Sequence, residues 1–264
     1  MTSPFRSMAT GAAFFSESHA GAAEMKLGYA WDHRLEAALI VGESGLGKTT
    51  LLRRFANRLA ADGHSVVDLF FARLDVDGLL AFIHQELEGP AEAIGRESRL
   101  RWIAQRAREL SHDDRGLAIL VDDAHLLRDA EIFEAMHMLL NLRDREGARL
   151  TIVLAGQRAL LADLGQVPAF AQRISVTATL APLAADQTAS YIRHLLRAAD
   201  LDDRLFEDEA IESIHNRSIG IPRTINCLCE MALIMAQADG RSSISRRDIE
   251  LLTPEFPVFC RDAA

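Results

Sequence analysis

The segment GESGLGKT, residues 42–49, constrains the fold of this chain more than any other part of its sequence. It satisfies the pattern G-x-x-x-x-G-K-[ST], and it lies between the apolar run 37–42 and the segment 48–63, in which leucine and phenylalanine recur at helical spacing. A strand, a glycine-rich loop and a helix in this order predict a phosphate-binding P-loop. The serine-hydrolase elbow G-x-S-x-G is excluded, because Leu46 occupies its last position.

Each residue type of the motif has a chemical task. Glycines let backbone N–H groups wrap around phosphates, and the N-terminus of the following helix adds partial positive charge. Lys48 is expected to reach the β and γ phosphates of ATP, and the hydroxyl of Thr49 is expected to ligate Mg²⁺. The predicted nucleotide-binding residues of this segment are Gly42, Glu43, Ser44, Gly45, Leu46, Gly47, Lys48, Thr49 and Thr50.

Two adjacent carboxylates follow the apolar run 116–121, at Asp122 and Asp123. Charge at the end of a buried strand is costly unless a cation offsets it. We therefore predict that Asp122 ligates the magnesium ion and that Asp123 prepares the attacking water. The alternative is a capping pair for the helix expected to begin near Ala130.

Short apolar strands alternate with amphipathic helices up to about residue 182. Strands are expected at 37–42, 64–71, 116–123, 150–156 and 173–180, and helices at 16–36, 48–63, 75–89, 96–111 and 130–147. Continuous apolar strands separated by helices predict an α/β fold with a five-stranded parallel sheet covered on both faces. The later segments predict helices only, at 185–199, 207–217, 221–238 and 245–253. The expected domains are therefore a nucleotide-binding core, 1–182, and a four-helix domain, 183–264.

The acidic composition limits the class of partner. The formal net charge is −9 at pH 7, so the average field repels nucleic-acid phosphates and anionic lipids. Aromatic residues make up 6% of the chain, which argues against a base-stacking platform. No apolar run approaches the roughly 20 residues of a membrane helix, so we predict a cytoplasmic protein without direct membrane insertion.

Cysteine and histidine show no metal-binding pattern. Cys227, Cys229 and Cys260 are too few for a disulfide scaffold, and reduced thiols are expected. Cys227 and Cys229 lie two residues apart on an expected helix and so face different sides of it. The nine histidines show no zinc-ligand spacing, and no structural metal is expected.

Taken in order and spacing, several segments resemble the AAA+ ATPases of the ExeA/GspA type over roughly residues 13–255. They are FFSESHA, GESGLGKTTLLRRF, LAILVDDAHLL, LLNLRDREGARLTIVLAGQRALLADL, QRISVTATLAPL and SIGIPRTINCLCEMALIMA. That family accompanies bacterial type II secretion and related envelope-assembly systems. The resemblance implies an AAA+ core with a helical lid domain, an ATP-dependent homo-oligomer, and a protein partner in such an assembly.

The resemblance also assigns roles to polar residues outside the P-loop. Gln157 matches the sensor that detects the γ phosphate through a water, and Arg223 matches the second sensor on the lid. Arg173 matches the arginine that enters the neighbouring subunit's nucleotide site, with Arg158 as its rival. A polar strand end, a surface arginine and a local helix cap are the respective alternatives. Phe15 and His19 match a segment beside the adenine.

The sequence departs from that family in three places. Asp123 stands where the family has Glu, and Phe71 ends the second strand where relatives often carry a polar residue. The sequence also ends after the expected four-helix domain, where full-length relatives continue into a membrane helix and a peptidoglycan-binding part. Contact with the envelope is therefore expected through a partner that recruits the protein to the inner membrane.

Asp in place of Glu withdraws the carboxylate of residue 123 by one methylene, or about 1.5 Å. A catalytic group misplaced by about 1 Å can lose roughly a hundredfold in rate. Because Asp123 keeps its charge, we predict slow but real ATP hydrolysis that is faster when subunits assemble and Arg173 completes the site.

Three functions follow. The first is an ATPase that drives or licenses the assembly of a bacterial multiprotein machine. The second is a DNA-binding transposition regulator of the TniB/TnsC type. A basic run around Trp102 favours this function, whereas the net acidity of the chain does not. The third is an ATP-gated interaction protein with negligible hydrolysis. The basic run consists of Arg96, Arg99, Arg101, Arg106 and Arg108.

Overall fold

The computed structural model of the chain describes residues 4–5, 14–69, 74–90, 95–127 and 129–252. These residues belong to two compact units. The sheet unit consists of residues 22–43 and 51–179, and the helical unit consists of residues 1–21, 44–50 and 180–264. Each unit is described on its own below. The prediction for Phe71 lies outside the described residues.

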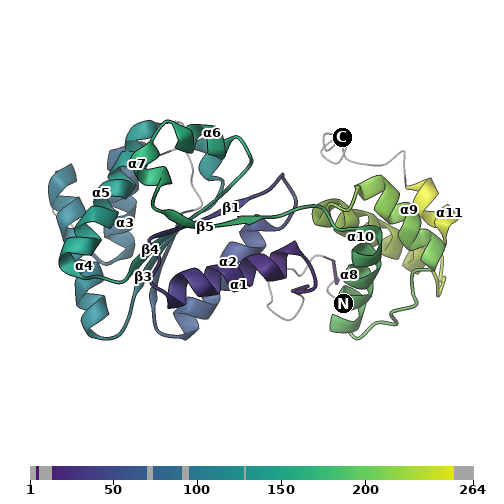
Figure 1. The fold of residues 1–264 in the computed structure, drawn as a ribbon. Coiled ribbons are helices and arrows are strands. Elements are labelled where there is room, and N and C mark those ends of the chain that lie inside the picture. Colours follow the sequence, from purple (N-terminus) through teal and green to yellow (C-terminus); the bar gives the residue numbers. More distant parts are fainter. Residues whose placement is uncertain (1–3, 6–13, 70–73, 91–94, 128, 253–264) are drawn as a thin grey trace. The chain divides into compact units, whose positions relative to one another are not determined.

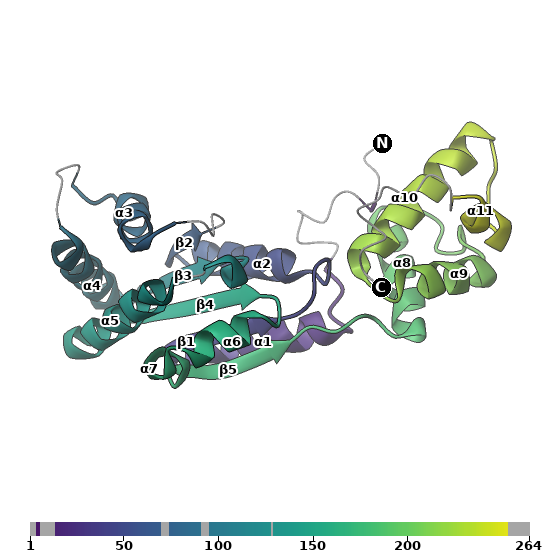
Figure 2. The same cartoon turned by 90° about the horizontal axis from the view of Figure 1, so that it is seen from above.

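A five-stranded parallel sheet forms the centre of the sheet unit, in the order β2-β3-β4-β1-β5 (Figures 1 and 2). Its strands are β1 (Ala37–Val41), β2 (Ser65–Leu69), β3 (Leu117–Val121), β4 (Leu150–Gly156) and β5 (Ile174–Thr179). Every residue of β1, β3 and β4 is buried, as continuous apolar runs require when helices cover both faces. The predicted α/β fold with a five-stranded parallel sheet is confirmed.

Helices cover both faces of this sheet. Alternate strand residues, such as Leu39, Ile119 and Ile152, share one hydrophobic core with helices α3 to α7. Helices α1 and α2 lie on the opposite side of the sheet (Figure 1). The helices are α1 (His19–Asp32), α2 (Lys48–Ala61), α3 (Val76–Glu86), α4 (Arg96–His112), α5 (Ala130–Glu146), α6 (Leu160–Gly165) and α7 (Pro168–Ala171). The sequence did not predict the short helices α6 and α7.

Local capping fixes the ends of α5. The carboxylate of Asp129 accepts a hydrogen bond from the N–H of Glu131 at 2.9 Å, and the helix ends at Gly147 with φ 66°. Glycine adopts this left-handed conformation at little cost, so the predicted stop at Gly147 is confirmed. The alternative that Asp122 and Asp123 cap α5 is wrong, because Asp129 is the cap.

The second part of the chain forms the four helices that the sequence predicts. They are α8 (Ala185–Ala198), α9 (Asp208–Ser218), α10 (Pro222–Ala238) and α11 (Arg246–Leu251). Their buried side chains form one core, to which Phe5, Phe15 and Phe206 also belong. Gly220 has φ 72°, and an added Cβ would lie 2.0 Å from the carbonyl oxygen of Leu183. The boundary at residues 182/183 stays a proposal, because residues 44–50 group with these helices.

The described cysteines lie on α10 of this bundle. Cys229 is fully buried and Cys227 is partly exposed, and no disulfide joins either of them to another described residue. Burial raises the pKa of the Cys229 thiol well above its ordinary value. Cys260 lies outside the described residues.

Across the part of the chain that the structure describes, no helix combines the length and the apolar character needed to cross a membrane.

Candidate nucleotide site

The carboxyl ends of three neighbouring strands gather predicted site residues at one edge of the sheet. Gly42 follows β1, Asp122 follows β3 and Gln157 follows β4. Gly42 donates a backbone hydrogen bond to the carbonyl oxygen of Gly156 at 3.1 Å, which extends the β1–β4 ladder to the start of the glycine loop. In parallel α/β sheets this edge is where ligands bind.

The P-loop has the backbone that phosphate binding requires. Gly45 and Gly47 have φ values of 82° and 95°, which side chains other than glycine rarely adopt. A Cβ on Gly47 would meet no atom within 4 Å, so the loop encloses open space there. Lys48 is the first residue of α2 and is only 7% exposed, and Thr49 follows it at the helix N-terminus. Anions bind at such a terminus.

Arg223 joins the bundle to the P-loop within the helical unit. Its backbone N–H, in the first turn of α10, donates to the carbonyl oxygen of Gly45 at 3.2 Å. Its guanidinium donates to the hydroxyl of Ser44 at 3.4 Å. The structure therefore brings the predicted second sensor to the predicted phosphate loop.

An apolar cavity lies beside the loop in the same unit. Gly47 and Thr50 form part of its wall, and Phe15 and His19 line it together with Tyr191. Phe15 packs edge-on against Tyr191 with ring centroids 5.7 Å apart. The lining is mostly apolar and partly aromatic, as the walls of ligand pockets are. The other lining residues are Phe14, Ser18, Ala20, Leu46, Leu180, Ala181, Leu183 and Pro222.

Asp122 and Asp123 lie in different environments. Asp122 is 8% exposed, and its carboxylate accepts a hydrogen bond from the N–H of Asp123 at 3.0 Å. Asp123 has φ 48° and ψ 36°, and its side chain is 56% exposed. Left-handed backbone at a residue other than glycine is strained, and such strain gathers at functional sites. One carboxylate is therefore buried and fixed, while the other faces outward from a strained turn.

Two further residues lie close to these carboxylates, and sequence reasoning missed both. The Nδ1 atom of His125 lies 3.9 Å from a carboxylate oxygen of Asp123. Asp68, on β2, has its carboxyl pKa raised by burial and by the charge of Asp122, against an opposing effect of Arg53. A charged residue inside the apolar run SVVDL was the available signal for Asp68.

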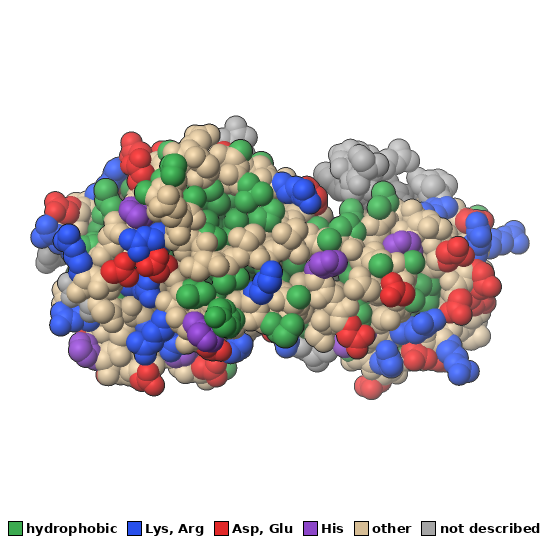
Figure 3. Space-filling view, in the orientation of Figure 1, with side chains coloured by type: hydrophobic (Ala, Val, Ile, Leu, Met, Phe, Trp, Pro, Cys, Tyr) green, Lys and Arg blue, Asp and Glu red, His purple; other side chains and the backbone are tan. Residues whose placement is uncertain are grey.

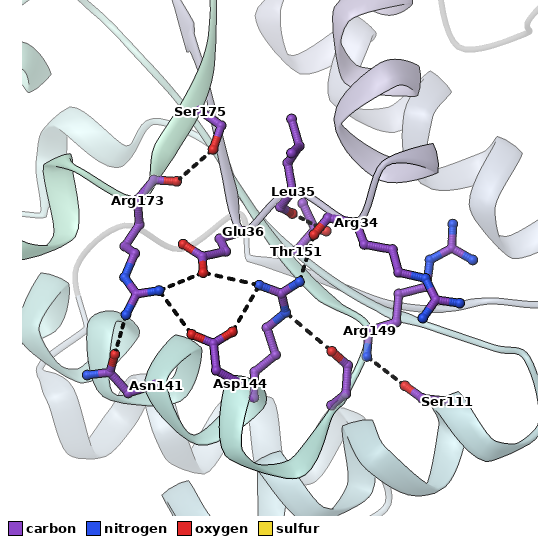
Figure 4. A network of polar contacts seen from close by, with 12 residues as sticks. Arg34, Leu35, Glu36, Ser111, Asn141, Asp144, Arg149, Thr151, Arg173 and Ser175 are labelled. Carbon is purple, nitrogen blue, oxygen red and sulfur yellow. Dashed lines mark hydrogen bonds and ion pairs between the residues drawn. The ribbon is translucent and has the colours of Figure 1, made fainter.

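Arg158 and Arg173, the two candidates for the arginine that enters a neighbouring subunit's nucleotide site, lie in very different surroundings. Arg158 is exposed two residues after β4, and its side chain forms neither a hydrogen bond nor an ion pair with another described residue. Arg173 precedes β5 and forms ion pairs with Glu36 and Asp144 (Figure 4). Gln157 is partly buried directly after β4.

The basic run on α4 is neutralised in large part. Arg96 lies 3.2 Å from a carboxylate oxygen of Asp77 and 3.2 Å from one of Glu131. Arg101 pairs with Glu97, and Arg106 pairs with Glu109. Trp102 packs against the core rather than standing free for a base, with its ring 4.4 Å from that of His84. Figure 3 shows acidic and basic side chains interspersed on the face it draws.

Comparison with known proteins decides the family. The family described as AAA domain matches residues 34–164. General secretion pathway protein A of Aeromonas hydrophila is 32% identical over 250 residues, which cover 92% of this chain and 44% of that protein. The chain is an AAA+ protein. The predicted resemblance is thereby confirmed.

Solved structures share the fold of this AAA+ protein. Cdc6p of Pyrobaculum aerophilum aligns with a TM-score of 0.72 and 19% identity, over 90% of this chain and 67% of that chain. The ORC2 protein of Aeropyrum pernix, in complexes with ADPNP and ADP, aligns with a TM-score of 0.70 and 18% identity, over 92% of this chain and 68% of that chain. The AAA+ protein spans less than two thirds of the length of the curated relatives it matches.

Proposed function

We propose that this AAA+ protein binds Mg-ATP, hydrolyses it slowly at the interface between subunits, and uses its nucleotide state to drive or license the assembly of a bacterial multiprotein machine. The observation that carries the proposal is the pair of hydrogen bonds from Arg223 to Gly45 and Ser44. Because these bonds end on the phosphate loop, a triphosphate bound there changes the partners available to Arg223. The bundle thereby senses which nucleotide is bound.

The residues present fit the cofactors. Lys48 would neutralise phosphate charge, and Thr49 and Asp122 are the proposed magnesium ligands, with hydroxyl and carboxylate oxygens of the kind that Mg²⁺ prefers. When bound, the metal would supply charge neutralisation at the phosphate oxygens. Asp123 would accept a hydrogen bond from the attacking water, and Gln157 would sense the γ phosphate. Arg173 of a neighbouring subunit would stabilise charge on the transferring group.

Secretion is the proposed setting, because a secretion protein is 32% identical to nearly the whole chain. The partner is proposed to be a protein of such an assembly system, which recruits this chain from the cytoplasm to the inner membrane. The relative is much longer than this chain, so the activity of its remaining length is not carried over.

A nucleotide-gated interaction protein with negligible hydrolysis is a second candidate. The outward, strained placement of Asp123 supports it, since a carboxylate that is 56% exposed is not yet held against a water. The DNA-binding candidate is not favoured, because internal ion pairs already neutralise Arg96, Arg101 and Arg106.

The test measures phosphate release and particle size together, over a range of protein concentrations, with ATP and magnesium. We expect hydrolysis that rises with assembly, is abolished in Lys48→Ala, and is unchanged in Lys26→Ala, which removes the chain's other lysine, on α1. Assembly with ATP but no phosphate release would establish the gated interaction protein instead. Assembly that requires duplex DNA and weakens steeply with salt would establish the DNA-binding regulator.

A further inference from the structure

Arg173 is held by side chains of its own subunit. One terminal nitrogen, Nη1, lies 2.6 Å from Glu36 Oε1 and 3.0 Å from Asp144 Oδ2. The other, Nη2, lies 2.5 Å from Asn141 Oδ1 (Figure 4). Three of the five N–H donors of the guanidinium are therefore engaged within the subunit, and they include both terminal nitrogens. The hydrogen bonds to Asp144 and Glu36 outweigh the effect of burial and raise the pKa of Arg173.

A second arginine, Arg143, lowers the electrostatic cost of releasing Arg173, because it lies beside the same two carboxylates. Arg143 Nη1 lies 3.5 Å from Glu36 Oε1 and 3.4 Å from Asp144 Oδ1. Arg143 is itself fixed, because it donates to the backbone carbonyls of Ala148 and Arg34. If Arg173 swings away, the two carboxylates keep a cation beside them, so no buried charge is left uncompensated.

The exposure of the cluster also permits release. The side chain of Arg173 is 27% exposed and that of Asp144 is 44% exposed, whereas Arg143 is 11% exposed. Arg143 is thus the buried member that stays, and Arg173 is the member at the surface. A planar guanidinium that leaves a carboxylate can form the same paired contacts with phosphate oxygens.

We infer that Glu36, Asn141 and Asp144 form an intrasubunit latch that withholds Arg173 from the nucleotide of a neighbouring subunit until that neighbour docks. The inference rests on the proposed function, in which Arg173 acts across the subunit interface. It follows from the geometry, because the edge formed by Nη1 and Nη2 cannot bind a phosphate with both nitrogens while each bonds its present partners. The latch adds a threshold to activation by assembly, because docking must compete with the contacts that hold Arg173.

The test removes the charge of one latch residue and keeps its size. In Asp144→Asn, we expect ATP hydrolysis at sub-saturating protein concentration to rise about two- to fivefold, the range that one exposed ion pair supplies. The protein concentration at half-maximal activity should fall by the same factor. Asn141→Leu, which removes no charge, should shift both quantities in the same direction. Asp77→Asn is the matched control, since it removes an exposed ion pair to Arg96 elsewhere on the sheet unit.

The outcomes separate the latch from the proposed function. A fall in activity in Asp144→Asn and Asn141→Leu, with unchanged assembly, would mean that these residues position Arg173 rather than withhold it, and the latch would be wrong. No change in either variant would also overturn it. Arg173→Ala tests the proposed function independently of the latch. Full ATPase activity in this variant would refute the role of Arg173 across the interface, whatever the latch variants show. Thermal unfolding of each variant establishes that the fold is intact.

Discussion

A carboxylate oxygen of Asp123 lies 3.9 Å from Nδ1 of His125, a ring nitrogen that is buried and has no hydrogen-bond partner among the described residues. The distance exceeds that of a hydrogen bond, but a small rotation of the exposed carboxylate would close it. The two residues follow the same strand, β3: Asp123 is the N-cap of the short 3-10 helix Ala124–Leu126, and His125 lies within that helix. His125 is therefore placed to orient the side chain of Asp123, which is one methylene shorter than the Glu of related ATPases.

The first prediction tests this role. His125→Ala should lower the rate of phosphate release about tenfold and leave the dissociation constant for ATP unchanged, because His125 acts through Asp123 rather than on the nucleotide. Steady-state hydrolysis and fluorescent-nucleotide binding measure the two quantities. His112→Ala, at the exposed end of α4, is the control. A matching loss of ATP affinity would point to a structural role instead.

The second prediction concerns the length of the side chain at position 123. Asp123→Glu should raise turnover, by up to about a hundredfold, because the carboxylate advances toward the water. Asp123→Asn should nearly abolish turnover, because the amide is a poor base. Asn tolerates the left-handed backbone of position 123 as Asp does, whereas Glu tolerates it less well, so Asp123→Glu should also lower stability slightly. Single-turnover phosphate release checks the order Glu, Asp, Asn; equal rates in all three would remove Asp123 from the mechanism.

Much of this architecture could be predicted from the sequence because its signals are local. Continuous apolar runs predict the buried strands β1, β3 and β4, and Gly147 predicts the end of α5. The helices α6 and α7 escaped prediction because six and four residues are too short to show a period of 3.6. Strand order was not predicted either, since it depends on contacts between distant segments.

The candidate site divides in the same way. The P-loop could be predicted because its pattern and its position between strand and helix agree. The polar contacts of Arg173 could not be predicted, because their partners are far from it and from one another in the sequence. Glu36 directly precedes β1, whereas Asn141 and Asp144 lie on α5. The partial burial of Trp102 against the core likewise weakens the DNA-binding reading that the basic run around it suggested.

The third prediction concerns Gly45. Gly45→Ala should weaken ATP binding strongly, because the added Cβ would lie 2.9 Å from Ile221 Cγ2 and 3.0 Å from Arg223 Cβ and would push α10 off the loop. Gly63→Ala is a matched control: its φ is 83°, against 82° for Gly45, but its Cβ would meet no atom within 4 Å. Both variants carry a backbone cost of about 1–2 kcal/mol. Calorimetric titration with ATP should show a loss in Gly45→Ala only; equal affinities would mean that contact with α10 does not matter for binding.

The fourth prediction uses the raised pKa of Asp68. Because burial and the charge of Asp122 disfavour its ionised form in the folded state, ionised Asp68 lowers the free energy of unfolding above that raised pKa. Asp68→Asn should therefore raise the melting temperature at pH 7, by about 1–2 °C for this partly exposed group. The gain should disappear as the pH falls below about 4, where Asp68 is protonated in both folded and unfolded states.

Thermal unfolding of nucleotide-free protein between pH 4 and pH 8 measures this difference. Glu134→Gln, which neutralises an exposed carboxylate on α5, is the control and should show no such pH dependence. A gain in Asp68→Asn that stays constant down to pH 4 would mean that side-chain packing, and not the charge beside Asp122, sets the stability at this position. A gain that tracks the ionisation of Asp68 would show that burial, together with the charge of Asp122, disfavours the ionised carboxylate in the folded state.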